Sequence, residues 1–164
     1  MFFIYMILIK NMSESDYSIK LETHDTKDIH DDHINGNLTV IWRDWDKILK
    51  NHPKMIYVSS VNPDEIKGPH IHTKRESYFT CIHGKVVFVI RKSDGSYDEI
   101  LSGDENPVMV HVPKNCSSAH MNLSPSVSRI LALADIAWRP NDNEMKNDFF
   151  DDYNWSKWEN YEKG

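Results

Sequence analysis

The residues best suited to chemistry in this chain are three histidines in its middle part. His70 and His72 stand two positions apart, and His120 follows later in the chain. In an extended segment, side chains at positions i and i+2 point to the same face, so the first two imidazoles share one face. An imidazole gains or loses a proton near neutral pH and, when neutral, binds metal ions. The sequence therefore predicts a pocket that gathers His70, His72 and His120.

Short segments rich in β-branched and aromatic residues surround these histidines. Residues typical of turns separate the segments, and no helical pattern alternates with them. This arrangement predicts an all-β sandwich or barrel and excludes a doubly wound parallel sheet. The expected strands cover residues 38–42, 55–61, 78–82, 85–91, 97–101, 108–112 and 128–134.

Two local features refine this expectation. His83-Gly84 separates two of the expected strands and predicts a tight hairpin, because glycine suits such turns. Residues 45–50 are the only expected helix of note, a turn or two long. The positions of the histidines therefore depend on short strands and the turns between them.

The residues around the histidines resemble the two short motifs of cupins, which are small β-barrel proteins. Gly68, His70, His72, Glu76 and Gly84 approximate the first motif, and Pro113, His120 and Asn122 approximate the second. Ser77 rather than Glu76 falls at the usual acid position, and Asn115 stands where the second motif has glycine. The resemblance implies an all-β fold, a cupin-type double-stranded β-helix or jelly-roll barrel, with short helical pieces and an aromatic C-terminal tail.

The resemblance also divides the chain into three parts. Residues 1–34 are expected to form an N-terminal extension that is partly disordered or pairs across a dimer. Residues 35–137 are expected to form the cupin barrel, and residues 138–164 a tail that packs on it.

Several longer segments are similar to dTDP-4-dehydrorhamnose 3,5-epimerases and related proteins that act on nucleotide-linked 4-keto sugars. They follow the order of that family and cover residues 36–39, 42–45, 67–70, 113–120, 138–144 and 153–155. The resemblance implies that His70 is the catalytic base, that His120 is its catalytic neighbour, and that Lys67 helps to hold the nucleotide sugar.

The chemistry of such a substrate explains why these residue types are needed. The hydrogens on C3 and C5 flank the C4 ketone, so a base with a pKa near neutrality can remove one as an enolate forms. A cation or a hydrogen-bond donor must then stabilise the enolate oxygen. The resemblance implies substrate contacts for Lys67, His72, Lys74, Arg75, Tyr78, Asn122 and Trp138. Lys67, Lys74 and Arg75 also fit a solvated run of charges, the usual place of such residues.

Two positions depart from the family pattern. The family returns the proton to the opposite face with a tyrosine, but residues 130–137 contain none. Ser77 stands where the family has a lysine that stabilises the enolate. A changed substrate, a changed reaction and a loss of activity all remain open at this point.

Three functions therefore compete. The leading hypothesis is a nucleotide-sugar epimerase or isomerase that uses no metal. The second is a metal-dependent cupin in which His70, His72 and His120 bind zinc, iron, manganese or nickel. The third is a cupin that binds a sugar nucleotide without catalysis.

Composition narrows the range of partners. The chain has 164 residues, enough for one domain, and a net charge of −6, which excludes nucleic-acid binding through neutralised phosphates. Cys81 and Cys116 form no metal-binding or disulfide pattern, so a cytoplasmic location is expected. The apolar run of residues 1–9 is too short to span a membrane and fits either an edge strand or an over-extended start. Free sheet edges and the aromatic tail predict a homodimer.

Overall fold

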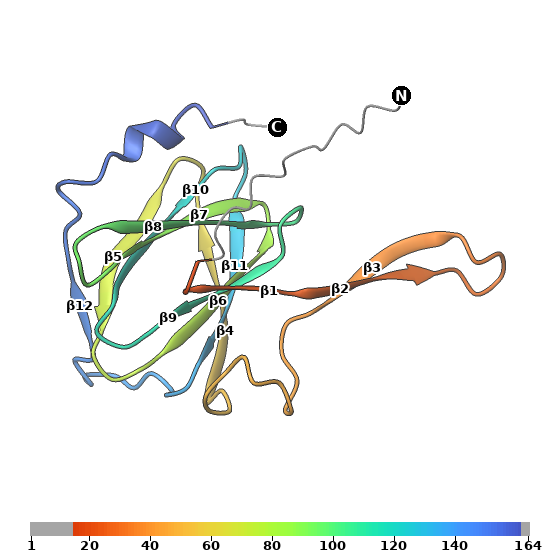
Figure 1. Cartoon of the computed structure of the whole chain (residues 1–164), viewed down its shortest axis with the longest axis horizontal. Coiled ribbons are helices and arrows are strands. Elements are labelled where there is room, and N and C mark those ends of the chain that lie inside the picture. Colours follow the sequence, from red (N-terminus) through yellow and green to blue (C-terminus); the bar gives the residue numbers. More distant parts are fainter. Residues whose placement is uncertain (1–14, 162–164) are drawn as a thin grey trace, which may run out of the picture.

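The computed structural model describes residues 15–161, in which twelve strands and one short helix build a β-barrel with a projecting hairpin (Figure 1). The elements are β1 (Ser18–Lys20), β2 (Glu22–Lys27), β3 (Ile34–Val40), β4 (Met55–Val61), β5 (Ile66–His72), β6 (Ser77–His83), β7 (Lys85–Arg91), β8 (Tyr97–Gly103), β9 (Val108–Val112), β10 (Ser117–Asn122), β11 (Ser128–Ala134), β12 (Met145–Asn147) and the 3-10 helix η1 (Trp155–Trp158). No helix in the described range has the length and apolar character to cross a membrane. The apolar run 1–9 lies outside the described residues.

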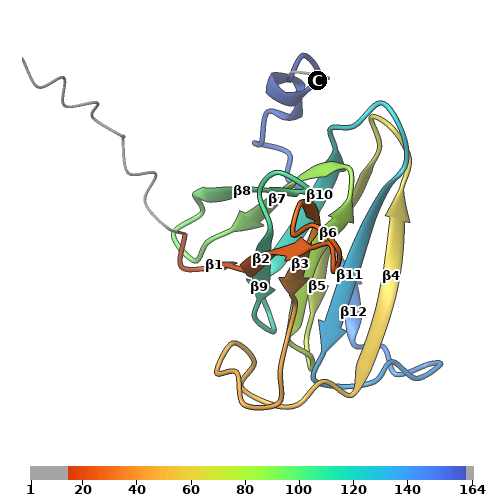
Figure 2. The same cartoon turned by 90° about the vertical axis from the view of Figure 1, so that its right-hand side faces the viewer.

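Two five-stranded antiparallel sheets face each other in the barrel (Figure 2). The first sheet has the strand order β1-β9-β6-β11-β4, and the second has the order β12-β5-β10-β7-β8. The expected strands 55–61, 85–91, 108–112 and 128–134 coincide with β4, β7, β9 and β11. The all-β barrel that the strand pattern predicted is therefore confirmed.

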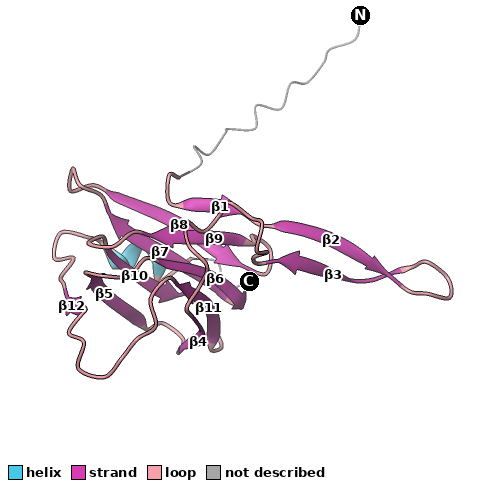
Figure 3. Ribbon diagram, turned by 90° about the horizontal axis from the view of Figure 1, so that it is seen from below, coloured by secondary structure: helices cyan, strands magenta, loops and turns pink. Residues whose placement is uncertain are grey.

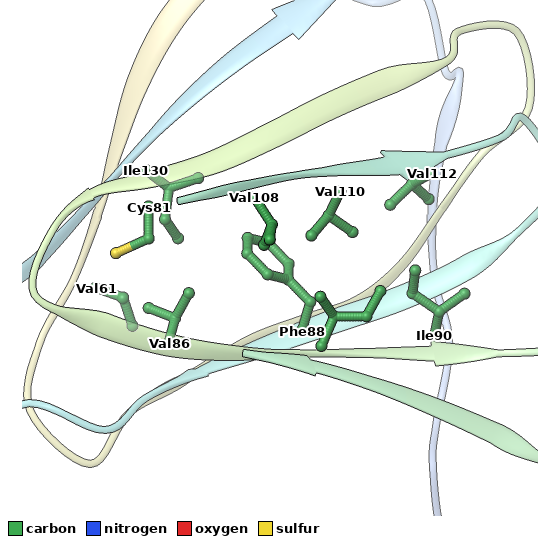
Figure 4. Packing of buried hydrophobic residues seen from close by; sticks show 10 residues of the cluster. Val61, Cys81, Val86, Phe88, Ile90, Val108, Val110, Val112 and Ile130 are labelled. Atoms are coloured by element: carbon green, nitrogen blue, oxygen red, sulfur yellow. The ribbon is translucent and has the colours of Figure 1, made fainter. Parts of the chain in front are cut away.

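The space between the two sheets is filled by alternate residues of the facing strands (Figure 4). On β7, Val86, Phe88 and Ile90 point into this core, while Val87 and Val89 belong to a second apolar cluster on the outer face. The strand carries apolar residues at every position because it is buried on both faces. The core also contains Val61, Cys81, Ile100, Val108, Val110, Val112 and Ile130.

The predicted hairpin at His83-Gly84 is wrong. The strands β6 and β7 on either side of Gly84 belong to different sheets: β6 pairs with β9 and β11, whereas β7 pairs with β8 and β10. A tight turn between two strands marks a hairpin only when they stay in one sheet. Here the chain uses the turn to cross from one sheet to the other.

The predicted helix at residues 45–50 is also wrong, because the segment consists of turns and bends. Its apolar side chains Ile48 and Leu49 pack with Tyr78 and Met109 on the outer face of the first sheet. The segment therefore covers part of that face without helical structure.

The hairpin of β2 and β3 extends away from the barrel, and we call it the arm (Figures 1 and 3). Most of its residues are exposed, including the loop histidines His30 and His33. The predicted strand 38–42 overlaps β3, which lies in the arm and not in the barrel. The expected boundary at residue 34 falls at the start of β3, inside the arm.

The C-terminal segment covers the outer face of the second sheet. Rings of this segment pack against Val87, Val89, Ala119 and Met121. The rings belong to Phe150, Tyr153, Trp155, Trp158 and Tyr161. Before them, β12 pairs with β5, so residues assigned to the tail by the sequence complete the second sheet.

A substitution at Gly84 tests whether the turn from one sheet to the other requires glycine. Its φ is +83°, and an added Cβ would lie 2.3 Å from Ser128 Oγ and 2.8 Å from Ser124 Oγ. We expect Gly84→Ala to lower the free energy of unfolding by at least about 2 kcal/mol, from backbone strain plus overlap. Gly95→Ala is the control, because Gly95 has a φ of +84° but no atom within 4 Å of the added Cβ. Chemical denaturation that gives equal losses for both variants would contradict a crowded crossing at Gly84.

Candidate active site

The pairing of β5 with β10 brings the predicted catalytic residues together. On β10, His120 lies opposite Phe88 and Ser118 lies opposite Ile90. Phe88 and Ile90 point into the barrel, and directly opposite residues share a face of a sheet, so His120 also points inward. Ser118 lies opposite His70 on β5, which gives His70 the same orientation. His70 and His120 therefore share one interior wall.

Both histidines have a ring nitrogen ready for a ligand. His120 Nε2 and His70 Nδ1 are buried and have no hydrogen-bond partner. Burial, with the nearby charges of Lys67 and His70, lowers the pKa of His120 to about 3. A neutral imidazole with one unpartnered nitrogen can exchange a proton or a hydrogen bond with a molecule in the interior.

Lys67 lies beside His120 and links the two sheets. It is the partner of His120 in the pairing of β5 with β10. Its Nζ donates to Ser59 Oγ at 2.6 Å and to the carbonyl oxygen of Ser60 at 3.1 Å, both on β4. The side chain is exposed, so Lys67 stands at the rim where β5 and β4 approach each other. An ammonium has a third hydrogen that remains available to an anionic ligand.

His72, two residues beyond His70, takes part in a buried cluster with Arg75 and Glu144. His72 Nδ1 lies 2.9 Å from Glu144 Oε1, and Arg75 Nη2 lies 3.2 Å from His72 Nε2. Arg75 Nε lies 3.1 Å from Glu144 Oε1, so the three side chains close a ring of contacts. Burial lowers the pKa of His72, Arg75 lowers it further, and Glu144 acts in the opposite direction. Both nitrogens of His72 are thus engaged within the protein.

Tyr57 is a candidate that the sequence reasoning missed. It lies on β4 opposite Ala132, which in turn lies opposite Phe79 on β6. Alternation along β4 puts Tyr57 on the same face as the core residue Val61. Burial raises the pKa of Tyr57, and Arg75 and Glu144 also influence it, with opposite signs. The phenol therefore stays protonated and lies near the charged cluster of the opposite sheet.

Ser77 and Glu144 also lie with these residues inside the barrel, and neither was predicted to contact substrate. Ser77 lies opposite the core residue Val112 and is 1% exposed, with an unpartnered Oγ. Glu144 is 3% exposed, and its Oε2 also has no partner. Alternation along 55–61 could have identified Tyr57, whereas no local pattern marks Glu144. We call the following residues the interior site: Tyr57, Lys67, His70, His72, Arg75, Ser77, His120 and Glu144.

Tyr78 is not brought to the interior site. Its ring stacks on His111 on the outer face of the first sheet, with 4.4 Å between ring centroids. Its hydroxyl donates to Glu76 Oε2 at 3.4 Å. Neighbouring residues of a strand face opposite sides, so Tyr78 points outward because Ser77 points inward. The substrate contact implied for Tyr78 does not fit this placement.

Asn122 lies inside the barrel but is occupied by structural hydrogen bonds. Its amide nitrogen donates to the carbonyl oxygens of Val61 and Ser126, at 3.0 and 2.7 Å. Its Oδ1 accepts from the backbone N–H of Ser124 and from Ser128 Oγ. Asn122 therefore fastens the turn after β10 and has no amide hydrogen left for a ligand.

Trp138 and Lys74 belong to the loop region outside the barrel. Trp138 is 57% exposed in the segment that follows β11. Lys74 Nζ donates to the carbonyl oxygen of Asp142 in the same segment, at 3.4 Å. This segment leads to Glu144, and the contacts with substrate implied for both residues stay predictions.

The three histidines do not form a preorganised metal centre. Within residues 15–161, the only group of three potential ligands with atoms mutually within 4.8 Å is Asp28, Asp31 and His33, on the exposed arm. Both nitrogens of His72 already contact Arg75 or Glu144. A bound metal would need these contacts to break, so the histidine set does not fit a three-histidine site as it stands.

Two hollows of the surface lie away from these histidines. One, of about 890 Å³, opens between β1 and β8, and another, of about 330 Å³, lies next to Cys116. Neither is lined by His70, His72 or His120. The interior site lies between the sheets, where the small side chains of Ala132 and Ala134 share the inward face of the opposite wall.

Burial of neutral His120 predicts a loss of stability in acid. The unfolded ring has a pKa of about 6.5 and the folded ring one of about 3, so between these values the unfolded chain binds more protons. Stability is therefore lost as the pH falls below about 6.5, and His120 accounts for about 2 kcal/mol between pH 7 and pH 5. Urea titrations should show a shallower pH dependence for His120→Gln, with the exposed-arm variant His30→Gln as control. Equal slopes for wild type and His120→Gln would contradict the burial of a neutral ring.

Comparison with known proteins places this geometry in a family. The family model FdtA (WxcM-like, C-terminal) matches residues 19–155. The spore coat polysaccharide biosynthesis protein SpsL of Bacillus subtilis (strain 168) is 24% identical over 131 residues, which cover 74% of this chain and 86% of that protein.

Solved structures share the fold. A dTDP sugar isomerase from Desulfovibrio desulfuricans G20 superposes with a TM-score of 0.67 at 16% identity, over 82% of this chain and 85% of that chain. QdtA, a sugar 3,4-ketoisomerase from Thermoanaerobacterium thermosaccharolyticum in complex with TDP, gives a TM-score of 0.62 at 18% identity, over 82% and 90% of the two chains. The cupin fold is thus confirmed, and the chain belongs to the FdtA (WxcM-like, C-terminal) family.

Proposed function

We propose that this protein is a nucleotide-sugar isomerase that removes a proton next to the 4-keto group of a dTDP-4-keto-6-deoxy sugar. The observation that carries the proposal is the distribution of unpartnered buried atoms. His70 Nδ1, His120 Nε2, Ser77 Oγ and Glu144 Oε2 are buried without a partner, and all belong to the interior site. Buried polar atoms are nearly always hydrogen-bonded, so such a concentration indicates a site built for a polar ligand. The fifth such atom in the described part, Ser117 Oγ, lies on the outer face.

A sugar fits this set of groups better than an apolar ligand does. A 4-keto sugar offers hydroxyl donors and carbonyl acceptors that match imidazole, carboxylate and serine groups. Lys67, at the exposed rim, suits the diphosphate of the nucleotide. The name of QdtA, with its bound TDP, and that of the Desulfovibrio protein support a dTDP-linked substrate.

The proposed reaction moves the carbonyl from C4 to C3. His70 removes the proton from C3, the C3–H electron pair forms a C3=C4 double bond, and the carbonyl electrons move to O4. Tyr57 gives O4 its proton, which yields an enediol. The tyrosinate then takes the proton from O3, and protonated His70 returns a proton to C4. Side chains supply every proton transfer, so the proposed reaction needs no cofactor.

The phenol of Tyr57 suits the exchange with the oxygens. Its raised pKa keeps it protonated in the resting enzyme, which a donor requires. Neutral His120, beside His70, can hydrogen-bond a sugar oxygen without adding a charge. The same base can serve C3 and C4 because these carbons are adjacent.

The second candidate reaction is 3,5-epimerisation, as in dTDP-4-dehydrorhamnose 3,5-epimerases. One observation favours it: Tyr57 lies on the sheet opposite His70, where a proton donor for the opposite face of the sugar would stand. We favour carbonyl migration, because QdtA is named as a sugar 3,4-ketoisomerase. The name of SpsL supports a role in polysaccharide biosynthesis, and the free thiols of Cys81 and Cys116 support a cytoplasmic location.

Isotope exchange tests the proposed reaction. The enzyme is incubated in heavy water with dTDP-4-keto-6-deoxyglucose carrying ¹³C throughout the sugar. We expect the ketone carbon signal to move from C4 to C3, and His70→Asn to slow this at least about 100-fold because the base is lost. His111→Asn, on the outer face of the first sheet, is the control and should keep wild-type activity.

Other outcomes would support one of the two alternative functions. Deuterium at C3 and C5 with an unmoved ketone would contradict carbonyl migration and support epimerisation. Tight binding of several nucleotide sugars without any exchange would reject catalysis and support a binding protein.

We also propose that the protein is a homodimer whose arms pack on the partner copy. An isolated two-stranded hairpin is marginally stable in water, and this arm exposes Ile34 (61%) and Leu38 (53%). The edge strand β4 exposes Ile56 (59%) and Val58 (52%) on the barrel. A second copy could cover both surfaces reciprocally, as two-fold symmetry requires.

Light scattering tests the role of the arm in the dimer. Ile34→Asp combined with Leu38→Asp should raise the dimer dissociation constant at least about tenfold, because burying new charges in an apolar contact is unfavourable. Ser93→Asp, in the exposed turn between β7 and β8, adds a charge away from the arm and should not change it. A wild-type monomer at micromolar concentration would reject the dimer.

A further inference from the structure

Glu144 is held in the barrel by its backbone as well as by its side chain. The backbone N–H of Thr73 donates to the carbonyl oxygen of Glu144 at 2.8 Å, and Thr73 Oγ1 donates to the same oxygen at 3.0 Å. The next residue, Met145, pairs with His72 on β5. The segment would therefore stay attached to the barrel without the Glu144 carboxylate.

The carboxylate is one of two groups that contact His72 Nδ1. Arg75 Nε donates toward His72 Nδ1 at 3.2 Å, and Glu144 Oε1 lies nearer to the same nitrogen, at 2.9 Å. A carboxylate only accepts hydrogen bonds and a guanidinium only donates them. A proton on Nδ1 of a neutral His72 would serve the nearer group, Glu144, while Arg75 Nε has Glu144 Oε1 within 3.1 Å and Arg75 Nη2 faces Nε2 at 3.2 Å.

A purely structural role explains this cluster poorly. Ion pairs buried to this degree gain little stability over apolar residues of similar size, because desolvation offsets their attraction. Glu144 is 3% exposed and Arg75 is 8% exposed. Moreover, Glu144 Oε2 has no partner, which a cluster selected only for stability would avoid.

We propose that Glu144 is a positioning residue that holds His72 in the Nδ1–H tautomer and keeps Arg75 fixed beside the interior site. This inference rests on the proposed function for its effect on catalysis, although its geometry does not. The charged groups that face His72 are Glu144, Arg75 and His70. Arg75 and Glu144 also act on Tyr57 across the interior. Arg75 and Glu144 thus place opposite charges near the proposed proton donor, Tyr57.

Imidazole ¹⁵N NMR tests the tautomer without any substrate. Wild-type His72 should show the Nδ1–H form, and an Nε2–H form would overturn the proposal outright. Glu144→Leu removes the acceptor and should abolish the preference for Nδ1–H, whereas Glu144→Gln keeps a carbonyl acceptor and should retain most of it.

Glu99 supplies a matched control for tail attachment. It accepts from Tyr153 at 2.8 Å and pairs with Lys157, so it also joins the tail to the barrel by a carboxylate, on the outer face. Glu99→Leu should leave the His72 tautomer unchanged. An equal change in Glu99→Leu and Glu144→Leu would reduce Glu144 to a structural role and overturn the proposal.

Steady-state kinetics extend the test to catalysis. We expect kcat to fall at least about 100-fold in Glu144→Leu and less than about tenfold in Glu144→Gln, with a smaller change in KM, because positioning acts mainly on the transition state. Equal loss in both variants would overturn the positioning role. If the tautomer changes as expected but wild type turns over no nucleotide sugar, the positioning of His72 stands and the proposed function fails.

Discussion

The register of β10 between β5 and β7 is the constraint on which the candidate site depends. The pairing with β7 sets His120 opposite the core residue Phe88, and the pairing with β5 sets Ser118 opposite His70. A shift of one residue would turn every one of these side chains to the outer face. The outer face of β10 resists such a shift, because Ala119 and Met121 pack there against Val87 and Val89 and would be replaced by polar side chains such as His120. Ordinary core packing thus holds the polar residues in place.

The interior combines neutral and charged groups in separate places. Burial beside Phe88 lowers the pKa of His120 and favours the neutral ring, whereas Arg75 and Glu144 form a buried ion pair. Lys67 lies at the exposed rim, where its Nζ donates a hydrogen bond to Ser59 on β4. Such a division suits a ligand with an anionic end at the rim and a neutral, hydroxylated end inside, which is the shape of a nucleotide-linked sugar. The protein keeps unpartnered atoms in the interior at a cost in stability that a ligand would relieve.

The sequence predicted the features that local pattern controls. Residues 55–61, 85–91, 108–112 and 128–134 alternate or run apolar between turn residues, and the strands have those bounds. His70 and His72 share a face because their spacing allows no other result in a strand. The sequence does not show which sheet a strand joins. A turn such as that at Gly84 has the same sequence pattern whether its two strands pair with each other or enter different sheets, and only the packing of the two sheets determines the outcome. The length of the arm was likewise not predicted, because most residues of its two strands are polar and show no apolar alternation.

The site residues also fall into two groups: those that local alternation could predict and those that only long-range strand pairing brings to the site. Tyr57 could have been found from its alternation with Val61, whereas Glu144 reaches His72 only because β12 returns to pair with β5. Tyr78 was misplaced because the face of β6 depends on whether Ser77 points inward, which the sequence alone did not reveal. Long-range pairing therefore decides which of the plausible polar residues meet.

The most direct test of the account is a titration of the ¹⁵N-labelled protein with dTDP-glucose, a stable analogue, followed through the histidine ring signals. The ring signals of His70 and His120 should shift at saturation, because their unpartnered nitrogens would face the ligand. Histidines of the exposed arm, His24, His30 and His33, should not shift. Binding that leaves His70 and His120 unchanged would contradict the claim that this interior holds the sugar.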